Sequence, residues 1–331
     1  MRSPDMRRAA RVASLAVAAV LLLVSGAAAE PPEHWFADWS KTDFDKRAIA
    51  LDEIVDGGPP KDGIRSIDAP VFIPVAEETA IPDTEPVIGL LLGGEARAYP
   101  LRYLMFHEIV NDVIGEVPVA VTFCPLCNSA IVFDRRIGGR TLEFGTTGKL
   151  RNSDLVMYDR QTESWWQQFL GEAIVGELTG TRLEMLPARV ESWAKFRARA
   201  AGGKVLKVEA SGFMPYGMNL YGGYDSRGNP PVYSGDLPDG IPPLSRVVSV
   251  GDEAWSFDLL RREGEIVAGD LTIRWTAGQN SALDSAIIAE GRDVGNVTVQ
   301  RRAGDGWEDV VHDVSFAFVF HAFRPDGTIH K

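Results

Sequence analysis

From residue 85 onward the chain consists of short apolar runs separated by glycine, proline and polar residues. Runs of this length predict β-strands joined by tight turns rather than long helices. Gly93-Gly94 and Gly138-Gly139 are the clearest turn signals, because a two-residue hairpin turn needs residues that tolerate a positive φ. We expect strands at residues 87–92, 96–99, 117–123, 130–134 and 141–144.

Helical patterns are few. Residues 101–112 predict a helix that is apolar on nearly every side and therefore buried. A second helix is expected at 189–200, whereas the apolar run 316–323, which contains His321, predicts a strand. Together these patterns indicate an α+β protein that is mainly β.

The chain divides into segments of different composition. After residues 1–29, residues 30–84 are rich in proline, aspartate and glycine and predict an entry segment of loops with one or two short elements. A first β-rich unit, which contains both cysteines, follows at 85–200. A second β-rich unit, without cysteines, occupies 201–331.

Parts of the first unit recur in the second. The sequence EARAYPL at 95–101 is echoed by EAWSFDL at 253–259, and the Asn-Ser-Ala of 128–130 returns at 280–282. Two interpretations are open: an internal duplication that produced two related β-rich subunits, or chance matches between short strands. A duplication would place Thr276 and Gln279 where the first copy has its cysteines, and would confine the chemistry to the first copy.

The first 29 residues have the three parts of a secretory signal peptide. Four arginines precede or begin an apolar run at 12–24, and three alanines at 27–29 form a small-residue cleavage site before Glu30. The run is too short for a comfortable permanent span, although an uncleaved anchor is the alternative. We expect a periplasmic or secreted protein with no stable membrane span after cleavage.

Charge narrows the range of partners. The whole chain has a formal net charge of −12, and removal of the signal segment, with its four arginines and one aspartate, brings this to about −15. An acidic surface repels phosphate groups, so we expect no nucleic-acid partner. The absence of a polybasic segment also gives no handle for anionic lipid.

The candidate chemistry centres on the two cysteines of the chain, Cys124 and Cys127, in the sequence Cys-Pro-Leu-Cys. A disulfide across so short a loop would add little stability, because it removes little entropy from the unfolded chain. The spacing therefore favours thiol–disulfide exchange or the binding of a soft metal ion such as copper or zinc.

A metal site needs more ligands, because one cysteine pair supplies only two. His107 is the best histidine candidate for a third ligand. We expect His107 and Asp134 to complete a catalytic site with the cysteines. Asn111 occupies the second histidine position of a His-Glu-x-x-His motif, which excludes that kind of zinc protease. The alternative for His107 is a core histidine that bonds to the backbone.

Polar and aromatic residues follow the cysteines. Residues 145–154 lack the first glycine of a phosphate-binding loop and predict a tight turn. In the aromatic segment that follows, adjacent tryptophans cannot face the same side of a strand, so one is expected to line a groove. For the adjacent Asp159 and Arg160, the alternative is a plain ion pair on the surface. The residues expected to bind a cofactor or ligand are Asn152, Asp154, Asp159, Arg160 and Trp166.

Three stretches carry a family resemblance: HEIVND at 107–112, VTFCPLCNSAIVFDRR at 121–136, and the run 144–187. With GGEARAYPL upstream and SFAFVFHAFRPDG near the end, they resemble the bacterial family DUF3179. The resemblance implies an exported or membrane-associated protein and no particular reaction. Its pattern covers His107, Glu108, Asn111, Asp112, Cys124, Pro125, Cys127, Asp134, Asn152, Asp154, Asp159, Arg160 and Trp166, and the chain departs from it at Asn128, Arg151 and His321.

Three functions are open on the sequence alone. The leading one is a soft-metal or thiol–disulfide redox site, with metal favoured because no thioredoxin-like β-α-β pattern surrounds the cysteines. The second is a periplasmic module that binds a small ligand or glycan, with a structural cysteine pair. The third is a purely structural exported protein. The expected partners are a small molecule, a metal ion or an exported protein.

Overall fold

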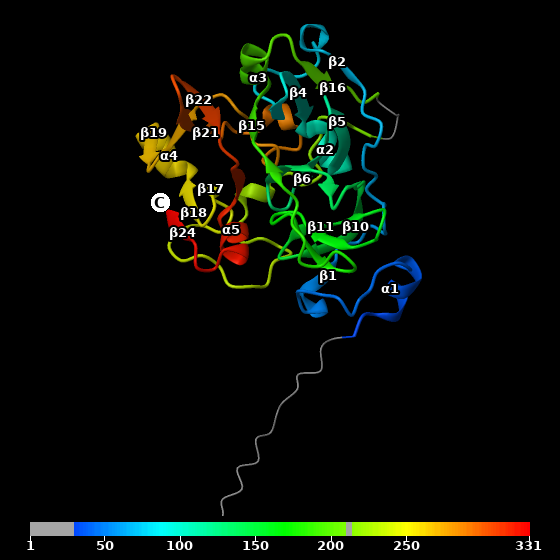
Figure 1. The fold of residues 1–331 in the computed structure, drawn as a ribbon. Coiled ribbons are helices and arrows are strands. Elements are labelled where there is room, and N and C mark those ends of the chain that lie inside the picture. Colours follow the sequence, from blue (N-terminus) through cyan, green and yellow to red (C-terminus); the bar gives the residue numbers. More distant parts are fainter. Residues whose placement is uncertain (1–29, 210–213) are drawn as a thin grey trace, which may run out of the picture.

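The computed structural model describes residues 30–209 and 214–331, so the predicted signal peptide at 1–29 lies outside the described residues. The described chain is mainly β, as expected, with five sheets of four or five strands in a propeller-like ring (Figure 1). Its helices are short: α1 (Glu33–Asp38), α2 (Leu101–His107), α3 (Trp193–Arg199), α4 (Phe257–Glu263) and α5 (Ala317–Phe323).

One sheet of the first half is built on the predicted hairpin. Gly93 and Gly94 form its turn with φ values of 58° and 84°, and Leu92 pairs with Glu95. This confirms the hairpin expected from the glycine pair. The sheet has the order β15-β3-β4-β16-β2. Its strands are β2 (Phe72–Pro74), β3 (Pro86–Leu92), β4 (Glu95–Pro100), β15 (Ala188–Ser192) and β16 (Lys204–Leu206).

The central sheet has the order β14-β7-β6-β5 and lies in the core. Its strands are β5 (Ile109–Ile114), β6 (Val117–Cys124), β7 (Ser129–Asp134) and β14 (Met185–Leu186). Most residues of β6 and all residues of β7 are buried. Strands covered on both faces appear in the sequence as continuous apolar runs, which is why 117–123 and 130–134 were recognisable.

The helix predicted at 101–112 is wrong in its second half. It ends at His107, Glu108 adopts a φ of 56°, and the chain turns into β5. Residues 109–114 include four β-branched side chains, which fit a pleated sheet better than a helix. The helix predicted at 189–200 is likewise shorter, because its first residues form the end of β15.

A third sheet has the order β1-β10-β11-β12-β13. Its hairpin turn is Asn152-Ser153, both with positive φ, between β10 and β11. The strands are β1 (Ile54–Asp56), β10 (Phe144–Arg151), β11 (Asp154–Asp159), β12 (Trp165–Gln167) and β13 (Glu172–Val175). The predicted strand 141–144 is replaced by a small hairpin, β8 (Arg136–Ile137) and β9 (Arg140–Thr141), with Gly138-Gly139 as its turn.

The second half repeats the strand order of the first hairpin sheet. Its order is β23-β17-β18-β24, with the final pair parallel, just as β4 and β16 are parallel. Helices follow the equivalent strands: α2 and α4 follow β4 and β18, and α3 and α5 follow β15 and β23. The strands are β17 (Arg246–Val250), β18 (Glu253–Ser256), β23 (Asp313–Phe316) and β24 (Thr328–His330).

The remaining sheet has the order β19-β20-β21-β22, from β19 (Glu265–Ala268), β20 (Leu271–Thr276), β21 (Asn296–Ala303) and β22 (Gly306–Asp309). The strand predicted at 316–323 is wrong, since residues 317–323 form the buried helix α5. A short run that is apolar throughout has no period that separates a buried strand from a buried helix.

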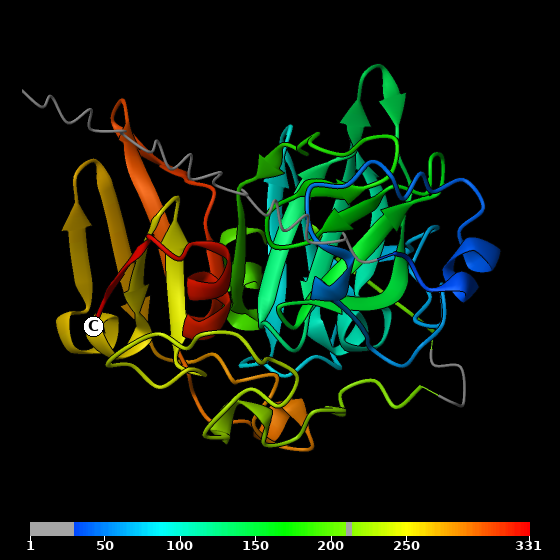
Figure 2. The same ribbon diagram turned by 90° about the horizontal axis from the view of Figure 1, so that it is seen from below.

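The two halves lie side by side, with the second half in yellow to red (Figure 2). Their contact includes the turn that carries the cysteines. The backbone N–H of Phe316 donates to the Cys127 carbonyl at 3.1 Å, and the Ser129 hydroxyl donates to Asp313 at 3.2 Å. The second half therefore holds the end of β6 and the start of β7 in place.

The entry segment adds its own aromatic cluster beneath β12. The fully buried ring of Trp165 lies 4.9 Å from Trp35, 5.2 Å from Trp39 and 5.5 Å from Phe44, measured between ring centroids. Residues 33–44 are thus part of the folded domain rather than a loose leader.

We expect Trp165→Ala to lower the free energy of unfolding by about 3–5 kcal/mol, because it removes a fully buried indole and leaves a cavity. Chemical denaturation with a fluorescence readout measures the change. Trp307→Ala is the matched control, since Trp307 is 40% exposed, and its cost should be clearly smaller. Equal losses for the two variants would contradict the packing described here.

Candidate functional site

The turn between β6 and β7 places both cysteine side chains on one side. Cys124 ends β6 and pairs with Ser129 at the start of β7. The Cys127 N–H donates to the Cys124 carbonyl at 3.2 Å, and Asn128 takes the positive φ, 53°, that completes the turn. The two cysteines are buried, approach each other to 3.6 Å and form no disulfide.

Asp154 completes a three-residue cluster with the cysteines. It is the first residue of β11, directly after the Asn152-Ser153 turn, and it is fully buried. One carboxylate oxygen and the two cysteine sulfur atoms all lie within 4.8 Å of one another. Cys124 Sγ also donates to the Ser153 carbonyl at 3.7 Å, which ties the two turns together.

The Asp154 carboxyl is bonded on one side only. Its Oδ2 accepts from Gln167 Nε2 at 2.6 Å and from the Phe169 N–H at 2.9 Å, whereas its Oδ1 is buried without a hydrogen-bond partner. Burial raises the pKa of Asp154 to about 6, although these two hydrogen bonds and hydrogen bonding by the Cys127 and Cys124 thiols oppose the increase. An unpartnered buried oxygen of this kind is available to a ligand.

Glu108 is a second buried acid beside the cluster. Its carbonyl accepts from the Phe123 N–H at 2.8 Å, so the residue lies against the end of β6. Burial, together with the charge of Asp154, raises the Glu108 pKa to about 8. Burial also raises the pKa of the Cys124 and Cys127 thiols. Without a cation, these groups therefore keep their protons at neutral pH.

Tyr221 and Tyr224 lie next to the cluster. Tyr224 is buried, and its ring centroid lies 6.0 Å from that of Phe316, whose N–H bonds to Cys127. Burial raises the pKa of both tyrosines, and the charges of nearby acidic groups add to the increase: Cys127 and Cys124 at Tyr224, and Glu108 and Cys124 at Tyr221. The sequence offered no motif at these positions.

Comparison with known proteins adds one finding. The model of the family described as protein of unknown function, DUF3179, matches residues 61–327. The chain belongs to the DUF3179 family. The search of curated proteins and the search of solved structures each found no match.

His107 of this DUF3179 protein does not join the cluster. Its Nδ1 bonds to the Arg65 carbonyl at 2.7 Å and its Nε2 to the Tyr216 hydroxyl at 2.8 Å, so both ring nitrogens are engaged. The structure thus places His107 as a backbone-bonded histidine, the alternative that the sequence had left open.

Asp134 is also remote from the cysteines. It pairs with Val119 at the opposite end of the β6–β7 ladder, five residues from the Cys124–Ser129 pair, which corresponds to about 16 Å. Its carboxylate forms an ion pair with Arg136. The sequence did not predict that Asp154 lies beside the two cysteines. Asp154 comes 27 residues after Cys127, and no local pattern shows that residues so far apart are in contact.

The expected ligand-binding residues separate into different environments. Asn152 stands in the turn before Asp154, close to the cluster in sequence. Asp159 is buried and accepts from Thr162 and from Trp166 Nε1, so it is neither a surface pair nor an open ligand site. Arg160 pairs with Asp68. Trp165 and Trp166 are both fully buried, which corrects the prediction that one of them lines a groove.

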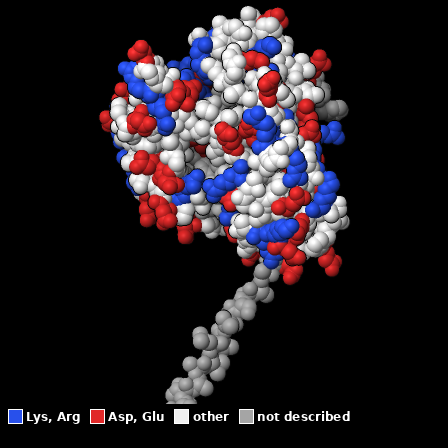
Figure 3. Space-filling view, in the orientation of Figure 1, with Lys and Arg blue, Asp and Glu red and all other residues white. Residues whose placement is uncertain are grey.

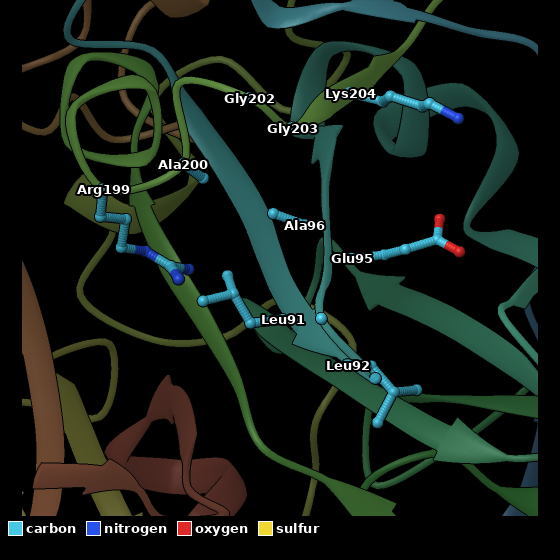
Figure 4. Close-up of a pocket in the computed structure, with 11 residues that line it drawn as sticks. Leu91, Leu92, Glu95, Ala96, Arg199, Ala200, Gly202, Gly203 and Lys204 are labelled. Carbon is cyan, nitrogen blue, oxygen red and sulfur yellow. The ribbon is translucent and has the colours of Figure 1, made fainter.

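A separate cavity of about 690 Å³ lies at the β3–β4 hairpin (Figure 4). Arg199 and Glu95 are among its lining residues, and Glu95 points away from Arg199 (Figure 4). Both have partners, since Arg199 pairs with Glu191 and Glu95 with Arg97. The cavity therefore offers no convergent reactive groups.

Acidic and basic side chains are interspersed over the face in Figure 3. Within residues 30–209 and 214–331, no helix is long and apolar enough to cross a membrane.

The raised pKa values predict how stability depends on pH. Glu108 has a pKa of about 8 in the folded protein and an ordinary value of 4.5, so the folded state retains a proton that the unfolded state has lost. The free energy of unfolding of metal-free protein should therefore fall as pH rises from about 5 to about 8. Urea denaturation across this range, in the presence of a chelator, measures the slope.

Glu108→Gln should make this slope shallower, because the amide has nearly the same shape and does not ionise. The exposed Glu263→Gln is the matched control and should keep the slope of the wild type. If the free energy of unfolding depends on pH equally in the wild type and in Glu108→Gln, Glu108 has the same pKa in the folded and unfolded states, which would contradict the prediction.

Proposed function

We propose that this protein binds one zinc-like divalent ion through Cys124, Cys127 and Asp154. The observation that carries the proposal is the arrangement of two sulfur atoms and a carboxylate oxygen within 4.8 Å, all in buried residues. Two sulfurs held tetrahedrally at about 2.3 Å from one zinc ion would lie about 3.8 Å apart. The two cysteines approach each other to 3.6 Å, and their sulfur atoms lie within 4.8 Å of each other, so little movement is needed to reach that spacing.

Electrostatics supports a cation at this position. Burying an acid is costly unless it is neutralised or paired. The largest influences on the pKa values of Cys127 and Glu108 are burial and neighbouring acidic groups, with no basic side chain among them. A bound cation would replace the protons that these groups otherwise retain.

The ligand set favours zinc over copper(I). Copper(I) prefers thiolate and thioether ligands, whereas zinc accepts thiolate and carboxylate together. Two thiolates and one carboxylate carry three negative charges. A divalent ion leaves one of them uncompensated in the buried site, and a monovalent ion leaves two.

Redox exchange is the second candidate, and the approach of the two cysteines is what favours it. Oxidation of the pair would release two electrons and two protons to a partner disulfide, through attack by one thiolate. Burial and the raised pKa of both thiols oppose formation of that thiolate. Metal binding requires no approach of a second protein to the buried sulfurs.

The glycan-binding alternative loses its structural basis, because the two adjacent tryptophans that were expected to form a groove are fully buried. For location, we propose export. The support is the arginine-rich start, apolar run and alanine cleavage site of residues 1–29.

We also propose that the halves are diverged copies of one unit. The support is the shared strand order of the two hairpin sheets, including their parallel edge pairs and the positions of four helices. Sequences of distant family members test this idea. Their two halves should resemble each other at equivalent strands, and unrelated halves throughout the family would argue for chance.

Metal-free protein should bind zinc with a one-to-one stoichiometry, and affinity should rise with pH because binding displaces protons. The Cys124→Ser/Cys127→Ser double variant should lose binding. Asp154→Asn should weaken it by more than the roughly 10- to 100-fold typical of an outer-shell change. Chelator competition and elemental analysis measure both effects.

Asp134→Asn and His107→Gln are the matched controls, since both residues were expected at the site from sequence and lie elsewhere in the structure. Both should bind zinc like the wild type. A protein that takes up no zinc, and whose two thiols convert reversibly to a disulfide with glutathione, would overturn the metal proposal in favour of redox exchange.

A further inference from the structure

Three protein ligands leave one position of a tetrahedral ion unfilled. Glu108 is buried nearby, but it is not a member of the cluster whose ligand atoms lie within 4.8 Å. Closed structural zinc sites have four protein ligands, whereas sites that act on other molecules keep three and an open position. What faces the fourth position therefore decides which kind of site this is.

Tyr224 faces this region with an unsatisfied hydroxyl. The residue is 3% exposed, and its hydroxyl oxygen has no hydrogen-bond partner. A buried hydroxyl without a partner is unfavourable, so a ligand that accepts its hydrogen bond would be stabilised at this position. Its neighbour Phe316 bonds to the Cys127 carbonyl, which places the tyrosine ring against the cysteine turn.

The segment that carries Tyr224 is hydrogen-bonded to another part of the second half. Tyr224 N–H donates to the Leu283 carbonyl at 3.0 Å, and Asn219 N–H donates to the Ala286 carbonyl at 2.9 Å. Both acceptors lie in the connection between β20 and β21, which spans residues 277–295. The equivalent connection in the first half is the short turn that carries the cysteines. The long connection of one half thus positions a side chain over the site of the other.

A cavity of about 430 Å³ reaches the same tyrosines from outside. Leu126, which stands between the two cysteines, and Leu150 form part of its wall together with Tyr221 and Tyr224. Its volume is within the range of small-molecule sites, and its lining combines apolar side chains with Asp56, Arg227 and the two tyrosines. None of the three cluster residues is part of its wall, and Leu126 is where the cavity meets the cysteine turn.

We propose that the metal position is open, and that a small oxygen- or nitrogen-donor ligand, such as water or a carboxylate, enters through this cavity, binds the ion and accepts a hydrogen bond from Tyr224. This inference rests on the proposed function, because it needs the ion. It assigns Tyr224 as a positioning residue for the ligand, and it distinguishes an exchangeable site from a closed structural one.

Cobalt(II) substitution tests the inference, because the visible absorption of a thiolate-bound cobalt ion reports its coordination. Metal-free protein is loaded with cobalt and titrated with azide and with acetate. We expect a saturable change in the visible bands of the wild type. Tyr224→Phe should bind cobalt normally and bind the probes about tenfold more weakly, as loss of one hydrogen bond to a charged group implies.

Tyr233→Phe is the matched control. Its hydroxyl bonds to the Asp236 carbonyl outside the cavity, so probe binding should match the wild type. Cobalt uptake with a spectrum that neither probe changes, or equal probe affinities in wild type and Tyr224→Phe, would overturn the open site while leaving the metal proposal intact. Failure to bind cobalt or zinc would instead overturn the proposed function itself.

Discussion

The turn between β6 and β7 is the constraint on which the site depends. Ladder pairing of Cys124 with Ser129 limits the loop to four residues, and the hydrogen bond from Cys127 to Cys124 closes it. From the other side, Phe316 bonds to the Cys127 carbonyl. These contacts leave the two thiols little freedom, so their mutual approach is a property of the backbone rather than of flexible side chains.

Burial determines how the two thiols of this turn ionise. The same two cysteines on a solvated loop would be ordinary reactive thiols, whereas here they are buried together with Asp154 and Glu108. Burial raises the pKa of both acids, and the charge of Asp154 adds to the increase at Glu108. Such a group of acids is stable either with its protons or with a cation, and this choice is the basis of the metal proposal.

The two halves contribute different residues to the site. The first half supplies both cysteines, Asp154 and Glu108, and the second supplies Tyr224, the buried acid Asp313 and the contacts that fix the cysteine turn. If the halves descend from one unit, the copy without cysteines has kept its sheets and lengthened the connection after β20. A structural copy can accept such an insertion because it carries no ligands of its own.

The sequence by itself determined the mainly β class and the hairpin at Gly93-Gly94, and it singled out Cys124 and Cys127 as candidates, because these follow from local periodicity, turn chemistry and residue type. It could not determine that 317–323 is a helix, since a uniformly apolar run fits either element. Asp154 was among the residues expected to bind a ligand, but the sequence could not show that Asp154 and Tyr224, rather than His107 and Asp134, lie near the cysteines. Partners far apart in the chain are brought together by sheet register and by contact between the halves, and these are decided only when the whole core packs.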